Sequence, residues 1–238
     1  MKRTITLAGF GALWALATTP AQATVISLFD YAFNIDGGLT EFLEGDPLPA
    51  NLDAGGFDFA TGLGRIDVTV AGAGDHNVTA FFDHDIDQEI NTFFNETGAT
   101  GGTAVAGQGW EIDEPGFVFG DIYDNLLAGT LDGTIGFPGA EDVSMAMGFE
   151  FSLAATQTAI VSFFLSVVNT APGFFLAQSD PHSIAFQLAP NQVFFWGALD
   201  ITGVIEPPPP PPTGVPEPTT LALLAAGLLS LGLRRRRS

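Results

Sequence analysis

The 238-residue chain contains no cysteine, and it has few basic residues outside its two ends. The lack of cysteine excludes disulfide bonds, covalent haem attachment and thiolate metal ligands. The stability of the fold must therefore come from packing, with bound ions as a further contribution. Lys2 and Arg3 begin the chain, Arg65 lies alone in the middle, and four arginines stand near the end.

The scarcity of basic residues leaves the middle of the chain strongly acidic. Residues 24–233 contain all 27 acidic residues and one basic residue, which gives a formal charge of −26 with histidine neutral. Such a surface repels phosphate backbones and anionic lipid, so nucleic acid is excluded as a partner. It attracts cations, basic proteins and cationic polymers. The same charge keeps an exported protein soluble, so it does not by itself indicate a binding site.

The N-terminus has the three parts of a secretion signal. Two basic residues precede an apolar run over 5–17, which as a helix of roughly 13 residues is about 20 Å long and too short to span a membrane. Ala21 and Ala23 then provide the small residues that signal peptidase recognises. We therefore expect residues 1–23 to be a signal peptide that is cleaved after Ala23.

The C-terminus also has three parts, which follow a proline-rich linker over 206–214. An apolar stretch over 219–233 predicts a short transmembrane helix of about 22 Å. The arginines after it favour the cytoplasmic face, which leaves the rest of the protein on the other side of the membrane. The motif before the helix consists of Val215, Pro216, Glu217 and Pro218. The basic cluster after it consists of Arg234, Arg235, Arg236 and Arg237.

This tail resembles the PEP-CTERM sorting signal of Gram-negative bacteria over residues 213–238. The resemblance implies that residues 215–238 are recognised by an exosortase, a membrane protease-transpeptidase that cuts near the motif. It implies an inner-membrane-anchored precursor that is held by its C-terminal helix before processing. The mature protein is then expected at the cell surface or outside the cell, in association with extracellular polysaccharide and biofilm matrix.

Between the two signals, residues 24–205 show the alternation of apolar and polar residues that is typical of β-strands. About eight to ten strands with Gly, Pro and Asp turns predict one all-β domain, an antiparallel two-sheet sandwich of jelly-roll-like type. Helical spacing is confined to 87–94 and 121–127. The Phe-Phe pairs, at 81–82, 93–94, 163–164, 174–175 and 194–195, are interpreted as core packing. The clearest strands are expected over 66–70, 78–82, 143–153, 159–167, 184–188 and 193–201.

Three aspartates, Asp83, Asp85 and Asp87, end the strand that begins near Val78. If the strand continues, their side chains lie on one face about 7 Å apart. Carboxylates so placed repel one another, and a structural calcium ion would relieve the repulsion. The spacing is not that of an EF-hand, because Gln88 stands where that loop needs glycine. The alternative is a solvated acidic strand end without a metal. No other cofactor is expected.

No motif in the chain identifies a reaction, and no catalytic residue is predicted. Glu111, Asp113 and Glu114 lie too close along one segment to resemble the facing carboxylates of a glycosidase. Nucleophile-elbow and phosphate-loop motifs are absent. Trp110 and Trp196 either form a sugar-stacking platform on a sandwich face or pack within the sheets.

The sequence is best interpreted as a non-enzymatic structural or interaction protein of the polysaccharide or biofilm matrix. One alternative is a carbohydrate-binding module with a calcium-stabilised sandwich, and another is a secreted glycan-active enzyme. Outward aromatic residues along a groove favour the binding module. Two opposed carboxylates about 5–9 Å apart in a concave pocket favour the enzyme. A convex surface with neither feature favours a structural protein.

The secretion signal predicts the N-terminus of the exported protein. Intact-mass analysis and N-terminal sequencing of the protein from medium and envelope fractions should show a chain that begins at Thr24. A full-length chain that retains Met1, recovered from the soluble cell interior, would contradict the prediction.

Overall fold

The computed structural model describes residues 25–41, 48–88, 92–181 and 191–203. The signal peptide, the linker, the sorting signal and the strand expected over 184–188 lie outside these residues. Among the helices that are described, none has the length and apolar character to cross a membrane.

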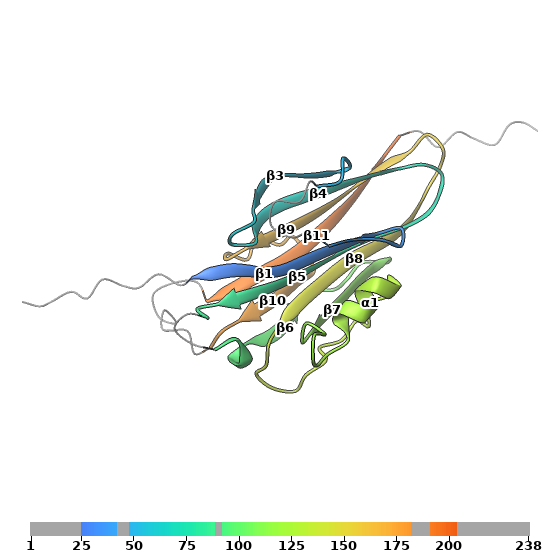
Figure 1. The fold of residues 1–238 in the computed structure, drawn as a ribbon. Coiled ribbons are helices and arrows are strands. Elements are labelled where there is room, and N and C mark those ends of the chain that lie inside the picture. The colour runs from blue at the N-terminus through green and yellow to red at the C-terminus, as the bar shows by residue number, and fades with distance from the viewer. Residues whose placement is uncertain (1–24, 42–47, 89–91, 182–190, 204–238) are drawn as a thin grey trace, which may run out of the picture. The chain divides into compact units, whose positions relative to one another are not determined.

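Two antiparallel sheets make up the described part of the chain (Figure 1). Sheet A has five strands in the order β2 (Gly38–Glu41), β1 (Ile26–Ile35), β5 (Gly74–Ile86), β8 (Ser144–Leu153) and β7 (Gln108–Asp113). Sheet B has six, in the order β3 (Leu52–Asp58), β4 (Leu63–Ala71), β9 (Thr158–Ser166), β11 (Gln192–Thr202), β10 (Phe175–Ser179) and β6 (Thr97–Gly101). This confirms the predicted all-β class and is consistent with a sandwich.

The main core lies between the two sheets and is built from the inward residues of both. Alternation along β5 places Phe82 in this core, where its ring lies 5.9 Å from that of Phe33 and 5.3 Å from that of Phe195. Phe163 of β9 contacts both of those rings, at 6.3 Å and 5.9 Å. The core is therefore an aromatic cluster that joins sheet A to sheet B.

The Phe-Phe pairs do not all belong to this core, which corrects their interpretation from sequence. Adjacent residues of a strand point to opposite faces, so a pair within a strand sends one ring to each side. Phe164, the neighbour of Phe163, stacks on Trp196 at 5.5 Å on the other face of sheet B. Phe94 lies in the 3₁₀ turn η1 (Phe93–Asn95), and its side chain is exposed.

The face of sheet A that points away from sheet B, here called the outer face, is covered by a helix and its loops. Helix α1 (Ile122–Ala128) packs Ile122 and Leu126 against Phe81, Ala32 and Ala146. The helix ends at Gly129, which adopts a left-handed conformation (φ 71°) that glycine accommodates without strain. Figure 1 shows α1 in front of β8 and β7. The sandwich thus has a second, smaller apolar layer on this side.

The last residues of β5 pair with β1 on one side but extend beyond the end of β8 on the other, where side chains take the place of a strand. The β5–β8 pairing ends at Asp83 and Ser144. Beyond it, the amide of Ile86 donates to Glu96 Oε1 at 3.0 Å, and Gln178 Nε2 donates to the carbonyl oxygen of His84. Burial raises the pKa of Glu96 to about 9, so this carboxyl group is protonated at neutral pH.

The aromatic core predicts a large loss of stability on truncation of a central ring. Phe82→Ala should lower the free energy of unfolding by about 3–5 kcal/mol, because it removes buried apolar contacts and leaves a cavity. Chemical denaturation measures the change. Val168→Ala, at an exposed position, is the control and should change stability by less than about 0.5 kcal/mol. A similar small effect for Phe82→Ala would contradict the described core.

Candidate functional site

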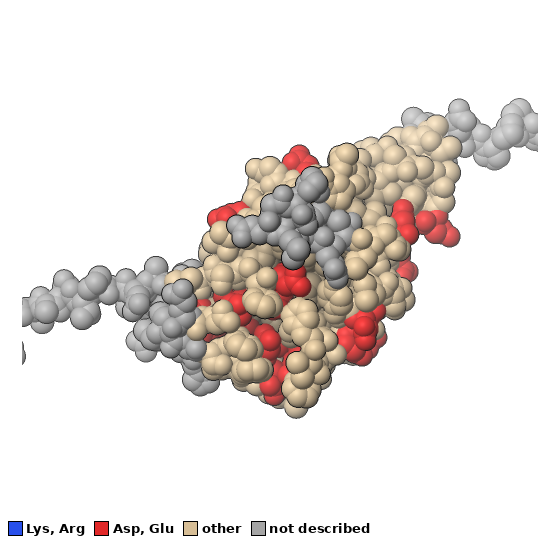
Figure 2. Space-filling view, in the orientation of Figure 1, with Lys and Arg blue, Asp and Glu red and all other residues tan. Residues whose placement is uncertain are grey.

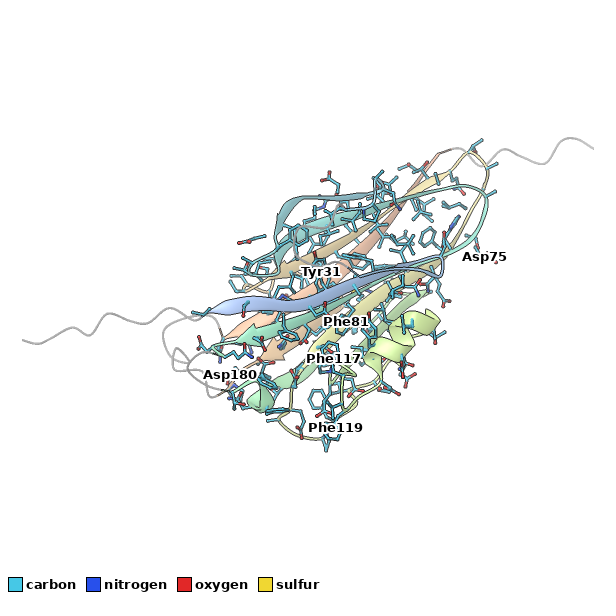
Figure 3. The ribbon with its side chains drawn as sticks, in the orientation of Figure 1. Tyr31, Asp75, Phe81, Phe117, Phe119 and Asp180 are labelled. Atoms are coloured by element: carbon cyan, nitrogen blue, oxygen red, sulfur yellow. The ribbon has the colours of Figure 1, made fainter. Side chains whose placement is uncertain are left out.

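An exposed aromatic surface lies beside the outer face of sheet A. Phe117 and Phe119 project from the loop between β7 and α1 (Figure 3), and their side chains are 56% and 66% exposed. Together with Phe29 and Phe94 they border a groove of about 400 Å³, here called the phenylalanine groove. Its complete lining is Phe29, Phe93, Phe94, Glu114, Pro115, Phe117, Val118, Phe119 and Asp142.

Local backbone geometry explains why these rings face solvent. The amide of Gly116 donates to the carbonyl oxygen of Phe119 at 2.9 Å, which closes a tight turn around Phe117 and Val118. Gly120 has φ 77°, and a Cβ there would collide with the carbonyl oxygen of Glu114. Phe29 lies at a β-bulge of β1, and its ring contacts that of Phe117 edge-on at 6.2 Å. The turn and the bulge therefore present the rings outward.

A row of polar residues crosses the outer face of sheet A next to the groove. Asp30 of β1 pairs with Asp83 of β5, Asp83 pairs with Ser144 of β8, and Ser144 pairs with Asp113 of β7. Paired residues of neighbouring strands share a face, so these side chains lie side by side. Asp113 is held by two amide donors, those of Glu114 at 2.9 Å and Asp121 at 3.1 Å.

Two further aspartates join Asp30 and Asp83 to form what we call the outer acidic cluster, which comprises Asp30, Asp83, Asp85 and Asp142. Asp85 lies two residues beyond Asp83 on the same face, and Asp142 lies two residues before Ser144. Burial, with repulsion from the other carboxylates, raises the pKa of Asp83 well above its usual range and that of Asp142 to about 6. The cluster therefore resists carrying its full negative charge.

The structure brings together only two of the three aspartates predicted as metal ligands. The condition set for the third aspartate, that the strand continues through Asp87, is not met, because β5 ends at Ile86 and Asp87 has a left-handed backbone (φ 57°). Asp87 Oδ1 instead accepts from the amide of Val25 at 2.8 Å. Asp83 and Asp85 lie on the outer face as predicted, and the calcium ion itself stays a prediction.

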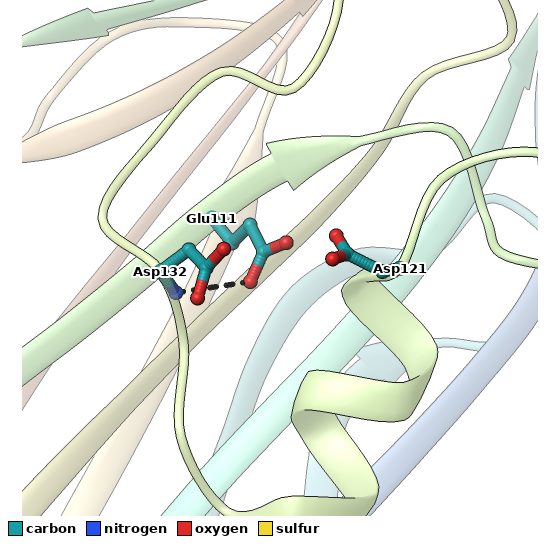
Figure 4. A group of neighbouring side chains, drawn as sticks. All are labelled: Glu111, Asp121 and Asp132. Atoms are coloured by element: carbon teal, nitrogen blue, oxygen red, sulfur yellow. Dashed lines mark hydrogen bonds between the residues drawn. The ribbon is translucent and has the colours of Figure 1, made fainter.

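A second carboxylate group lies between β7 and α1 (Figure 4) and was not recognised from sequence. Each of Glu111, Asp121 and Asp132 offers an oxygen within 4.8 Å of the others, which suits a hard cation such as calcium. Glu111 is buried and accepts from the amide of Asp132 and from Asn125 Nδ2, both at 3.1 Å. Burial raises the pKa of Glu111 to about 7. The three residues are separated in sequence, so no local pattern indicated the group.

Trp110 and Trp196 do not form an open platform. Trp196 is buried against Phe164, and Arg65 lies over the Phe164 ring at 5.2 Å. Trp110 contacts Phe174 at 5.5 Å at the margin of the core. Both residues therefore pack within the sheets, which was one of the two alternatives for them.

Comparison with known proteins gives one match. Residues 214–237 match the family model described as the PEP-CTERM protein-sorting motif, which includes Val215, Pro216, Glu217 and Pro218. The chain therefore carries this motif near its C-terminus, as its resemblance implied. The motif supports an exported protein that is processed by an exosortase and transiently anchored in the membrane. No curated protein and no solved structure matches the chain.

The raised pKa of Glu111 predicts how stability depends on pH when divalent cations are removed. The pKa of Glu111 is higher in the folded protein (about 7) than its usual value of 4.5, so folding favours the protonated carboxyl group. Its contribution to stability is complete below pH 4.5 and is lost as the pH rises through about 7. Denaturation in chelator between pH 5 and 8 should show a smaller loss for Glu111→Gln than for wild type.

Asp200→Asn is the control for this experiment, because it removes one charge at an exposed position of β11. Its pH dependence should equal that of wild type. An equal loss of stability for Glu111→Gln and wild type would show that Glu111 does not titrate in this range.

Proposed function

We propose that the protein is a non-enzymatic interaction protein of the extracellular polysaccharide matrix, delivered to the cell surface through its sorting motif. The observation that best supports this proposal is the exposed phenylalanine groove. Soluble proteins rarely expose a contiguous apolar patch without a binding role. The four exposed rings of this groove, those of Phe29, Phe94, Phe117 and Phe119, form such a patch. The Gly116 turn and the Phe29 bulge hold three of them outward, and Phe94 lies in the 3₁₀ turn η1.

The chemistry of the groove suits sugar rings. The C–H faces of a sugar pack against aromatic rings, and its hydroxyl groups donate to carboxylates. Glu114 and Asp142 line the groove beside the rings and supply such acceptors. Outward aromatic residues along a groove therefore favour a binding protein over a structural protein with a convex surface.

The charge of the surface narrows the ligand class. On the face seen in Figure 2, acidic side chains are visible and no basic side chain appears among the coloured residues. Arg65 lies on sheet B and pairs with Asp67 at 2.8 Å. Such a surface repels anionic polymers and attracts cationic ones. We therefore expect neutral or cationic polysaccharides as ligands.

The carboxylate geometry favours binding over hydrolysis. Glycosidases separate their two carboxyl groups by about 5–5.5 Å where one of them is the nucleophile, and by about 6.5–9.5 Å where a water molecule attacks. Glu111, Asp121 and Asp132 have oxygens within 4.8 Å of one another, which suits a shared cation better. Glu111 is also held by Asn125 and the Asp132 amide, so its oxygens face protein donors.

Binding can be measured by affinity electrophoresis of the exported chain in gels that contain cellulose derivatives, chitosan or alginate. The neutral and cationic polymers should retard the protein, and alginate should not. The double variant Phe117→Ser/Phe119→Ser should weaken binding about tenfold or more, because central aromatic contacts contribute over about 1 kcal/mol each.

Val168→Ser is the matched control, because it removes another exposed apolar side chain and should bind as wild type. Unchanged retardation of the Phe117→Ser/Phe119→Ser variant would contradict the proposal. Sedimentation of both variants identifies the competing use of the groove: if it joins two copies of the chain, the double variant alone loses a dimer.

A further inference from the structure

Asp180 is a fully buried aspartate that directly precedes an exposed proline. It follows the last residue of β10 (Figure 3) and is 0% exposed, whereas Pro181 is exposed. The peptide bond between an aspartate and a proline is chemically labile. The aspartate carboxylate can attack the carbonyl carbon of its own residue, and the tertiary nitrogen of proline accepts a proton and leaves more readily than an ordinary amide nitrogen.

Two asparagine side chains contact the groups of Asp180 that such a reaction uses. Asn95 Nδ2 donates to Asp180 Oδ1 at 3.0 Å and so holds the carboxylate. Asn191 Nδ2 donates to the main-chain carbonyl oxygen of Asp180 at 2.9 Å. That oxygen gains negative charge when its carbon is attacked, and a donor already placed on it stabilises the transition state. The attacking group and the carbonyl group are therefore both held in place before reaction.

The backbone that presents these groups is fixed by sheet B. Ser179, the residue before Asp180, pairs with Gln192 of β11. The amide of Asp180 donates to the carbonyl oxygen of Asn191 at 3.0 Å, so Asn191 contacts Asp180 through its backbone and its side chain. Asn95 Oδ1 is buried, and no described residue donates to it. Buried acceptors left unsatisfied are costly and rare, and a chemical role is one of the few reasons for them.

We propose that the chain cuts its own peptide bond between Asp180 and Pro181. A carboxylate oxygen of Asp180 bonds to the main-chain carbonyl carbon of the same residue, and the bond from that carbon to the Pro181 nitrogen breaks. The nitrogen takes a proton from solvent and becomes a new N-terminus. Water then opens the cyclic anhydride that is left on Asp180. The sum of the two steps is the addition of one water to the peptide bond.

Pro181 favours this reaction over the usual alternative for an aspartate. In other sequences the amide nitrogen of the next residue attacks the aspartate side chain, which gives a succinimide and leaves the chain uncut. Proline has no N–H, so this alternative is closed. Because Pro181 is exposed, water has access to the departing nitrogen.

The cut leaves the two parts of the domain associated under native conditions. Strand β11 lies after the cut, between β9 and β10 of sheet B, and its Phe195 packs against Phe82 and Phe163 in the aromatic core. The sorting motif at 214–237 also lies after the cut. The attachment of residues 24–180 to an anchored tail then depends on the pairing and packing of β11 instead of a covalent bond.

Incubation of the exported chain, purified in mild detergent, in mildly acidic and in neutral buffer tests the proposal. Mass spectrometry should find one fragment that ends at Asp180 and one that begins at Pro181, with masses that sum to the chain plus one water. The fragments should elute together in native size-exclusion chromatography and separate in denaturant.

The chain contains its own control, because a second Asp–Pro bond joins Asp46 to Pro47, outside the described residues. In the folded protein the bond at 180–181 should be cut about tenfold or more faster than the bond at 46–47, because only the first has the asparagine contacts described above. In urea, where those contacts are lost, the two bonds should be cut at similar rates.

Variants separate the chemistry from a loss of structure. Asp180→Asn keeps an acceptor for Asn95 but has no carboxylate, and it should stay uncut at this position. Asn191→Ala should slow the cut at 180–181 about tenfold or more and leave that at 46–47 unchanged. Pro181→Ala should also slow the cut, and it changes an exposed residue, so it tests the reaction even if the buried variants do not fold. Asn169→Ala, at an exposed asparagine, is the control and should be cut as wild type.

The proposal is overturned if the folded wild-type chain stays intact at 180–181, or if its preference for this bond over 46–47 persists unchanged in urea. It is equally overturned if folded Asp180→Asn or Pro181→Ala is cut there at the wild-type rate, which would indicate a contaminating protease. No polysaccharide enters these measurements, so their failure is separate from that of the proposed function.

Discussion

Buried negative charge on the outer face of sheet A is the constraint on which the rest of the structure depends. One face of this sheet joins the aromatic core through Phe82 and its neighbours, which leaves Asp83 and Asp85 on the other face. That face is nevertheless covered, by α1 and the loops on either side of it. Carboxylates are costly to bury without partners. Helix α1 and its loops therefore cover carboxylates that repel one another unless protons or a cation neutralise their charge.

The loop between β7 and α1 both covers the outer face of sheet A and forms part of the phenylalanine groove. The chain that leaves β7 is fixed by Asp113, which accepts from the amides of Glu114 and Asp121. Between those two anchors, the turn presents Phe117 and Phe119 to solvent. Asp142 belongs to both regions, since it lines the groove and acts on the Asp83 charge. A change in the charge of the outer acidic cluster therefore occurs next to the phenylalanine groove, which we propose as the ligand site.

Local patterns predicted the strands well and the site only in part. Alternation over 143–153 and 159–167 corresponds to β8 and β9, because a strand with one buried face has its side chains in period two. The order of strands in each sheet depends on which distant segments pair, and the alternation of apolar and polar residues gives no information about that. For this reason Asp30 and Asp142 could not be placed beside Asp83. Nothing in the sequence indicated the left-handed backbone of Asp87. The exposure of Phe94 was not predicted, because the residue belongs to a Phe-Phe pair of the kind that is typical of cores.

The export account and the account of the domain are supported by different parts of the chain. The motif at 214–237 concerns sorting, whereas the groove and the carboxylates concern the role of the delivered domain. Infrared spectroscopy of the exported domain at neutral pH, in buffer without divalent cations, tests most directly whether protons neutralise the buried charge. The band of a protonated carboxyl group should be present and should weaken in Asp83→Asn, because burial and the neighbouring carboxylates raise the pKa of Asp83 well above its usual range. A spectrum with no such band, or one that Asp83→Asn leaves unchanged, would contradict this claim.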